Sequence, residues 1–500
     1  MKRFIALLGL ILFFSSSLAQ GTLVLARAAD TTGLDPHTQT AFASFRLLEL
    51  IYEPLVTLDG DLNIVPALAE SWSFNDDSTV LTMNLRQGVT FHDGSPFTSA
   101  DVKASFERIL NEETGAASRA NFTSIESIDT PDDYTAVFNL NTPDVPLLAA
   151  MASVGAAIVS DEFIAGGEDF AAKAIGTGPF ILDQWTPEEV TTLRANTDWW
   201  GEGPYVDGIE MRVIPDETSI VAALRAGQID FALLNDPIAA TLLIGDSSVQ
   251  LNQVPALAYH VLQLNASREP MDKLEVRQAI SCAIDRQEVL DTASLGYGEV
   301  TGPLTIPAFK VPNDELFCYS KDVDKAKELL AQAGYADGLS LKAIVASAEP
   351  PTALSEAQSI QAQLAEVGID LEIESLELSV YIDRWLAADF DTAVALNGGR
   401  PDPYTMYVRY FTKDGNLLKV SNYVDDTLDS LMAEGRAESD PAQRLEIFTQ
   451  FQKHLTEMSP WVWLYHDFEY TAQQPYVSGF VPNPTDSLYS LSQVKLEGKE

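Results

Sequence analysis

Helical and strand-like spacings of apolar residues alternate along the chain. Residues 23–26 form a short apolar strand, and residues 81–85 and 136–140 alternate as strands with one solvent-facing side do. Apolar positions three and four residues apart, often after a polar capping residue, predict helices in six further segments: 42–52, 98–110, 216–226, 273–290, 322–333 and 440–455. This mixture predicts an α/β protein.

Residues 460–466 (PWVWLYH) form a strand whose alternating positions carry large rings. Trp461, Trp463 and Tyr465 share one face of this strand. Aromatic side chains in this arrangement usually belong to a core, but the two tryptophans can also offer stacking faces to a ligand. The sequence leaves both interpretations open.

The segment 91–110 (FHDGSPFTSADVKASFERIL) places a histidine beside an aspartate. Neighbours in an extended segment point to opposite faces, so His92 and Asp93 are poorly placed to act together. Thr98 stands three residues before Asp101, as in the capping box that starts a helix. The segment therefore predicts a turn and a helix N-terminus, not an acid–base site.

Composition narrows the class of protein. The 500 residues, 46% of them hydrophobic, are enough for two or three packed domains. Acidic residues outnumber basic ones by 73 to 31, which gives a net charge of -42. Nucleic acids and anionic membrane surfaces need a basic binding face, so neither is expected as a partner. We interpret the acidic surface as a solubilising one.

The N-terminus has the pattern of a secretory signal peptide over residues 1–19. Two basic residues precede an apolar run over residues 4–14, and small residues follow up to Ala19. The apolar run is too short to span a bilayer. We expect cleavage, export to the periplasm or another extracytoplasmic space, and no membrane insertion of the mature chain.

The two cysteines, Cys282 and Cys318, form no CxxC pair and have no neighbouring histidine, so a zinc site is not indicated. Export permits a disulfide. The sequence leaves open both a disulfide and two buried thiols.

Motifs for catalysis are missing from the sequence. It contains no GxSxG, HExxH, GxGxxG or P-loop string, and its five histidines lack metal-site spacing. Carboxylates are so numerous that any pair of them says nothing about glycoside hydrolysis. We therefore predict no enzyme activity, no catalytic residue, no metal site and no cofactor.

Several longer motifs follow one another in a recognisable order. They are LAESWSFNDDSTVLTMNLRQGVTFHDGSPFTSADVKASFERI, preceded by GLDPH, then IGTGPFILDQW, NTDWWGEGPYVDGI, LRAGQID, LNASREPMDKLEVRQAISCAIDR, AKELLAQAGYADG and finally FDTAV with a later Asp-Pro. In this order, over nearly the whole mature chain, they resemble the peptide/nickel (family 5) solute-binding proteins of ABC importers.

The resemblance implies a fold. It is the two-lobe clam of the type II (cluster C) periplasmic binding proteins, with an extra domain inserted in the first lobe. The implied boundaries are a discontinuous first lobe at 20–54, 177–264 and 483–500, an extra domain at 55–176 and a second lobe at 265–482.

The resemblance also implies a function. A member of this family captures peptides or peptide-like small solutes by hinge closure and delivers them to ABC importer permease subunits. Alternatives are the same fold binding an oligosaccharide, a secreted acidic hydrolase that uses two carboxylates, and a sensing role in place of transport.

Ligand-binding residues are expected from the same resemblance. In peptide-binding relatives a late loop carries an acid that pairs with the ligand's amino group, but no acid stands clearly at that place in this chain. Arg400 is instead a candidate for a ligand carboxylate, with a surface arginine as the alternative. The complete set of candidates is His37, Thr38, Trp385, Asn397, Gly398, Arg400, Asp402, Trp461 and Trp463.

Overall fold

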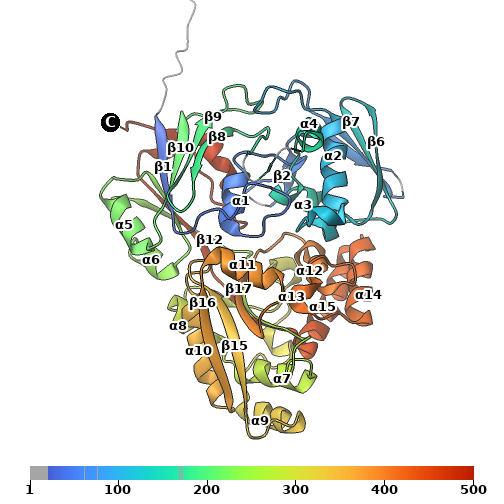
Figure 1. Cartoon of the computed structure of the whole chain (residues 1–500), viewed down its shortest axis with the longest axis vertical. Helices are drawn as coiled ribbons and strands as arrows, with labels where there is room; N and C mark the ends of the chain where they lie inside the picture. The colour runs from blue at the N-terminus through green and yellow to red at the C-terminus, as the bar shows by residue number, and fades with distance from the viewer. Residues whose placement is uncertain (1–20, 61, 76, 168, 171–172, 500) are drawn as a thin grey trace, which may run out of the picture.

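The computed structural model describes residues 21–499 except 61, 76, 168 and 171–172. The predicted signal peptide, residues 1–19, lies outside the described residues. Sheets of seven, six and four strands organise the molecule. Figure 1 shows the seven-stranded sheet beside the four-stranded one, with the six-stranded sheet below them. Each sheet with its helices is named below as a lobe or a domain.

The first lobe contains a seven-stranded sheet. Its strand order is β12-β19-β11-β1-β10-β9-β8. In that order the strands are Gln250–Pro255, Phe468–Gln473, Phe231–Leu234, Thr22–Arg27, Gly208–Val213, Val190–Ala195 and Phe180–Thr186. β1 is parallel to both of its neighbours, whereas β19 runs antiparallel between β11 and β12. Helices α1 (Phe42–Leu48), α5 (Glu217–Arg225) and α6 (Pro237–Thr241) belong to this lobe.

The second lobe contains a six-stranded sheet with the order β14-β18-β13-β17-β15-β16. In that order the strands are Glu299–Val300, Trp461–His466, Tyr259–Leu264, Thr392–Asn397, Leu339–Ala346 and Ile369–Leu376. Its helices are α7 (Leu274–Ala283), α8 (Arg286–Ser294), α9 (Val323–Gln332), α10 (Ala353–Ala365), α11 (Leu378–Leu386), α12 (Pro403–Phe411), α13 (Leu418–Ser421), α14 (Asp426–Ala437) and α15 (Pro441–Met458). Every residue of β13 and β18 is buried, as expected for central strands covered on both faces.

The elements of the extra domain lie between Ala69 and Ala165. Its four-stranded sheet, β4-β5-β7-β6, consists of Ala69–Phe74, Val80–Leu85, Thr135–Leu140 and Ile125–Asp132. Helices α2 (Ser99–Leu110), α3 (Leu147–Met151) and α4 (Asp161–Ala165) accompany this sheet. The smaller strand pairs of the chain are β2 (Val56–Leu58) with β3 (Ile64–Pro66), and β20 (Val477–Ser478) with β21 (Lys495–Leu496).

Local sequence signals account for most helix starts. Thr98 and Asp101 form the predicted capping box at the start of α2. Asp440 caps α15, with a proline at its first position. One expectation differs: the helix predicted over 273–290 is divided into α7 and α8, because Ile284 is extended and Asp285 caps a new helix.

The chain crosses between the lobes at two adjacent segments. Residues 256–258 lead from β12 into β13, and Asp467 alone separates β18 from β19. The amide of Ala256 donates to the carbonyl of Asp467 at 3.0 Å, so the two crossings are joined. The expected boundaries at 264 and 482 lie elsewhere, because β13 pairs with β17 and β18 of the second lobe and β19 pairs with β11 and β12 of the first.

The structure shows that the two cysteines form a disulfide. Cys282, at the end of α7, is bonded to Cys318 in the loop before α9.

Among the described residues, no helix is both long and apolar enough to cross a bilayer.

Candidate functional site

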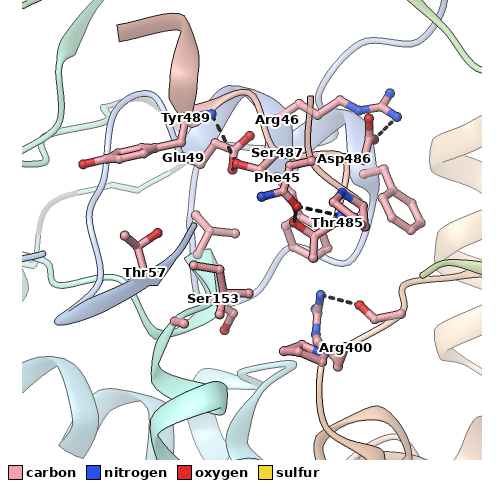
Figure 2. A pocket seen from close by; sticks show the side chains of 18 of the residues that line it. Phe45, Arg46, Glu49, Thr57, Ser153, Arg400, Thr485, Asp486, Ser487 and Tyr489 are labelled. Atoms are coloured by element: carbon pink, nitrogen blue, oxygen red, sulfur yellow. Dashed lines mark hydrogen bonds and ion pairs between the residues drawn. The ribbon is translucent and has the colours of Figure 1, made fainter. Parts of the chain in front are cut away.

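A cavity between the lobes is lined by parts of all three units. Residues of α1 and the segment 483–489 form one side, residues 152–154 of the extra domain form another, and residues 399–401 approach from the second lobe. Figure 2 shows Arg400 on the opposite side of this space from Phe45 and Glu49. The empty space of this main chamber is about 1010 Å³, including the part open to solvent.

Helix α1 presents charged side chains at the main chamber. Arg46 pairs with Asp486, and its guanidinium donates to Asn235 Oδ1 at 2.7 Å. Glu49 accepts hydrogen bonds from the Ser487 hydroxyl, at 2.7 Å, and from the backbone amide of Leu488. Burial raises the pKa of Glu49 to about 7. These contacts connect α1 to residues 486–488 and give both Arg46 and Glu49 partners within the protein.

Glu469, on strand β19, also lines the main chamber. Among the described residues, no hydrogen-bond donor or ion-pair partner reaches its carboxyl group. Burial raises the pKa of Glu469 to about 8, while Arg46 opposes that shift. A carboxyl group in this state can accept or donate a hydrogen bond to a bound solute.

An inner chamber continues from the main one. The two share Phe42, Phe45 and Arg400 as lining residues. Helix α11, the end of β17 and the last turn of α12 form most of the rest of the inner wall, to which residues 40–41 and Glu349 also contribute. Its surface is largely apolar and aromatic, as ligand pockets usually are.

Four of the predicted site residues meet at the inner chamber. Trp385, Asn397, Gly398 and Arg400 all line it, and Arg400 lines the main chamber as well. The indole of Trp385 donates to Gln263 Oε1 at 2.6 Å, which leaves its ring as the surface offered to a ligand. These four residues come from α11, the end of β17 and the loop that follows it, which are close in sequence.

Arg400 is a charged side chain of the cavity that has almost no partner in the described chain. Its only hydrogen bond within the described chain goes to the Gly399 carbonyl at 3.4 Å, drawn in Figure 2, and no described carboxylate lies within ion-pair distance. Burial, with a contribution from the nearby Arg409, lowers the pKa of Arg400 to about 10. The guanidinium is therefore cationic at neutral pH and open to an anionic partner.

Two other predicted residues, His37 and Asp402, have structural partners. The His37 ring is fully buried between the Ala157 carbonyl, 2.9 Å from Nε2, and Arg108, 2.8 Å from Nδ1. Burial lowers the pKa of His37 to about 4, so the ring is neutral. Asp402 caps α12 and forms an ion pair with Arg444 at 2.7 Å. Neither side chain lines the two chambers.

The remaining predicted residues lie away from both chambers as well. Trp461 and Trp463 are each 1% exposed and pack in the core of the second lobe, so they offer no stacking face. The Trp463 indole donates to Tyr407 Oη at 2.8 Å. Thr38 lies in the turn next to His37, outside either lining.

Several lining residues were not predicted from the sequence. Three of them, Phe42, Phe45 and Arg46, belong to α1, and Glu49 caps its C-terminus. The apolar spacing of this helix was recognised from the sequence, but the side that faces the cavity was not. The segment 483–489 carries no motif, so only its packing against α1 reveals it. No group of three or more His, Cys, Asp or Glu residues in the described chain is arranged to hold a metal.

Comparison with known proteins identifies the family. The model of the bacterial extracellular solute-binding proteins, family 5 middle, matches residues 63–417. The chain belongs to this family. It is a solute-binding protein of the type that serves ABC importers, and its two-lobe fold with an extra domain is that of its structural neighbours.

Individual relatives agree with the family assignment. The chain is 26% identical to the glutathione-binding protein GsiB of Salmonella typhi, over 96% of both chains. It is 27% identical to the dipeptide-binding protein of Escherichia coli (strain K12), over 94% of both chains. These curated relatives are binding proteins rather than enzymes, and the family is extracellular.

Two solved structures are similar over almost their full length. One is the ABC transporter-associated periplasmic binding protein DppA from Helicobacter pylori in complex with the peptide STSA. It has 29% identity and a TM-score of 0.87, with 95% of this chain and 98% of that one covered. The other is AgaA from A. tumefacien R10 in complex with agropinic acid. It has 29% identity and a TM-score of 0.89, with 96% and 99% covered.

Proposed function

We propose that this protein is the extracytoplasmic substrate-binding component of an ABC importer. In this role it is exported by a cleaved signal peptide and captures a peptide or peptide-like small solute between its lobes. It then delivers the unchanged solute to membrane permease subunits. The observation that carries the proposal is the cavity between the lobes, lined by α1, by the extra domain and by the loop after β17.

Closure provides the physical mechanism. A solute in the main chamber contacts both lobes only when they approach each other, so binding shifts a hinge equilibrium toward the closed form. The crossings at 256–258 and at Asp467 are short and adjacent, which suits a hinge that two paired segments share. The closed form then presents both lobes together to the permease.

The ligand class is supported by the relatives. GsiB and the dipeptide-binding protein are named for small peptides, and DppA was solved with a peptide. AgaA, with similar identity, was solved with an organic acid. The solute of this protein is accordingly a peptide or a peptide-like small molecule. The oligosaccharide alternative loses its main support, because Trp461 and Trp463 are buried in the core.

A two-carboxylate hydrolase is also poorly supported by the cavity. Of the carboxyl groups at the main chamber, Asp486 is paired with Arg46, and Glu49 is held by a hydroxyl and an amide. Glu469 is then the one carboxyl group of the described lining without such partners. Glycoside hydrolysis needs a pair.

The test is to identify what the protein holds and whether it changes. Protein purified from an extracytoplasmic fraction is denatured, and released small molecules are identified by mass spectrometry. The identified compound is then returned to ligand-free protein, with scattering recorded before and after, and is analysed again after prolonged incubation. We expect a peptide or peptide-like compound, a more compact envelope and complete recovery of the compound. A chemically converted compound, or an unchanged envelope at saturation, would refute the proposal.

A further inference from the structure

Two arginines at the inner chamber lack the acidic partners that are abundant elsewhere in this protein. The chain has 73 acidic residues against 31 basic ones, and most arginines of its described part form an ion pair with a carboxylate. Arg400 and Arg409 are exceptions, because neither has a carboxylate oxygen within ion-pair distance in the described part of the chain. Buried Arg286, by comparison, is also without a carboxylate but donates to several backbone carbonyls.

Both guanidiniums belong to the same wall. Arg400 lies in the loop after β17 and Arg409 lies in the last turn of α12, and both line the inner chamber. The Arg409 guanidinium lies over the ring of Tyr410 at 4.7 Å from its centroid. The two positive charges are close enough for Arg409 to lower the pKa of Arg400. Such mutual repulsion is relieved by an anion that contacts both groups.

Two other polar side chains of this chamber, Tyr381 and Glu349, already have partners. The Tyr381 hydroxyl donates to the Val394 carbonyl at 2.9 Å. Glu349, the acid of this wall, accepts from the amides of Phe42 and Ala43 at 3.0 and 3.3 Å. Its carboxylate is thus used in a contact between the lobes and does not neutralise the arginines. The surface open to a ligand is largely apolar and aromatic, and it carries the two cations.

We propose that Arg400 and Arg409 form an anion-binding subsite, so that the solute is a carboxylic acid whose carboxylate enters the inner chamber. This inference rests on the proposed function and specifies its ligand. A carboxylate can accept two parallel hydrogen bonds from one guanidinium and a further one from a second. The neighbouring apolar part of the solute then lies against Phe42, Trp385 and Tyr410.

The experiment compares matched peptide libraries. A mixture of dipeptides and tripeptides with free carboxyl termini is incubated with ligand-free protein, and retained peptides are identified after gel filtration by mass spectrometry. The same mixture with amidated termini is tested in parallel. We expect retention of the free acids and on the order of 10- to 100-fold weaker retention of the amides, since a hydrogen bond to a charged group is lost.

Variants assign the effect to the two arginines. Arg400→Gln and Arg409→Gln should each weaken retention of the free acids on the order of 10-fold or more, and Arg400→Lys should recover part of it. The control is Arg384→Gln on α11, because Arg384 is paired with Glu374 and Asp389. Thermal melts establish whether each variant is folded. If a glutamine variant is unfolded, the Arg400→Lys variant still tests the subsite.

The possible results separate the two proposals. Equal retention of acids and amides overturns the anion subsite and leaves the solute-binding function standing. Equal retention by the control and by both glutamine variants overturns it as well. If neither library is retained by the unmodified protein, peptide capture itself is refuted, and the anion subsite for a peptide acid falls with it.

Discussion

The disulfide gives a quantitative prediction about the second lobe. Cys282 and Cys318 are 36 residues apart in the sequence, and their bond closes a loop that contains α8 and the segment before α9. Closing a loop of this length removes about 13 cal/mol/K of entropy from the unfolded chain, which corresponds to about 4 kcal/mol at 25 °C. Loss of the bond should destabilise the second lobe by about this amount.

Urea unfolding followed by tryptophan fluorescence measures the effect. Trp385, Trp461 and Trp463 are buried in the second lobe and report on its transition. For a slope of roughly 2 kcal/mol/M, the midpoint of that transition should fall by roughly 2 M in a Cys282→Ala, Cys318→Ala variant. A protein of several domains need not unfold in one two-state transition, so the transition of the second lobe is fitted alone.

Internal controls make this test strict. The single variant Cys318→Ala should lose as much stability as the double variant, because either change removes the same bond. A reductant should lower the midpoint of the unmodified protein and leave the double variant unchanged. A loss below about 1 kcal/mol, or a reductant effect that persists in the double variant, would contradict the loop-entropy reasoning.

Three further predictions follow from single contacts. Gly399→Ala should weaken solute binding and lower the melting temperature, because the added Cβ would stand 2.0 Å from the Leu257 carbonyl oxygen. Gly398→Ala should change both little, because its Cβ would be 3.4 Å from the nearest atom. Glu469→Gln should match the unmodified protein in melting temperature near pH 4.5 and exceed it at pH 8 and above. The raised pKa, about 8, makes the stability contributed by the protonated acid disappear as the pH rises through that range, and equal pH profiles would contradict this. Arg436→Met should cost about 3–5 kcal/mol in denaturant unfolding by leaving the buried Asp144 carboxylate unpaired, and adding Asp144→Asn should recover most of the loss; no recovery would exclude the ion pair as the cause.

The sequence predicted local structure well where neighbouring residues decide it. The capping box of Thr98 and Asp101 and the proline start of α15 depend on contacts within one helical turn, and both are present. The division of α7 from α8 was missed, because the apolar stripe continues past Asp285 and conceals the cap. The same local reasoning correctly interpreted the His92 segment as a turn.

The site was predicted only in part. The end of β17 and the loop after it contain Asn397, Gly398 and Arg400, so one short segment carried several candidates into one place. Asp402, two residues beyond Arg400, was included by proximity, yet its side chain turns away to cap α12 and to pair with Arg444. Sequence position fixes where a backbone passes but not which way each side chain points.

By itself, the sequence determined the mixed α/β character, the caps and strands, and the order of motifs that marks the family. Each of these depends on residues a few positions apart, or on a pattern that needs no partner. Only the tertiary structure decided which strands join which sheet, and that Phe42 meets Glu349 across 307 positions of sequence. It also decided that Arg400 and Arg409 have no carboxylate partner among the described residues, although the protein is acidic. Pairing and exposure are set by packing between distant segments, whose free energy no local pattern encodes.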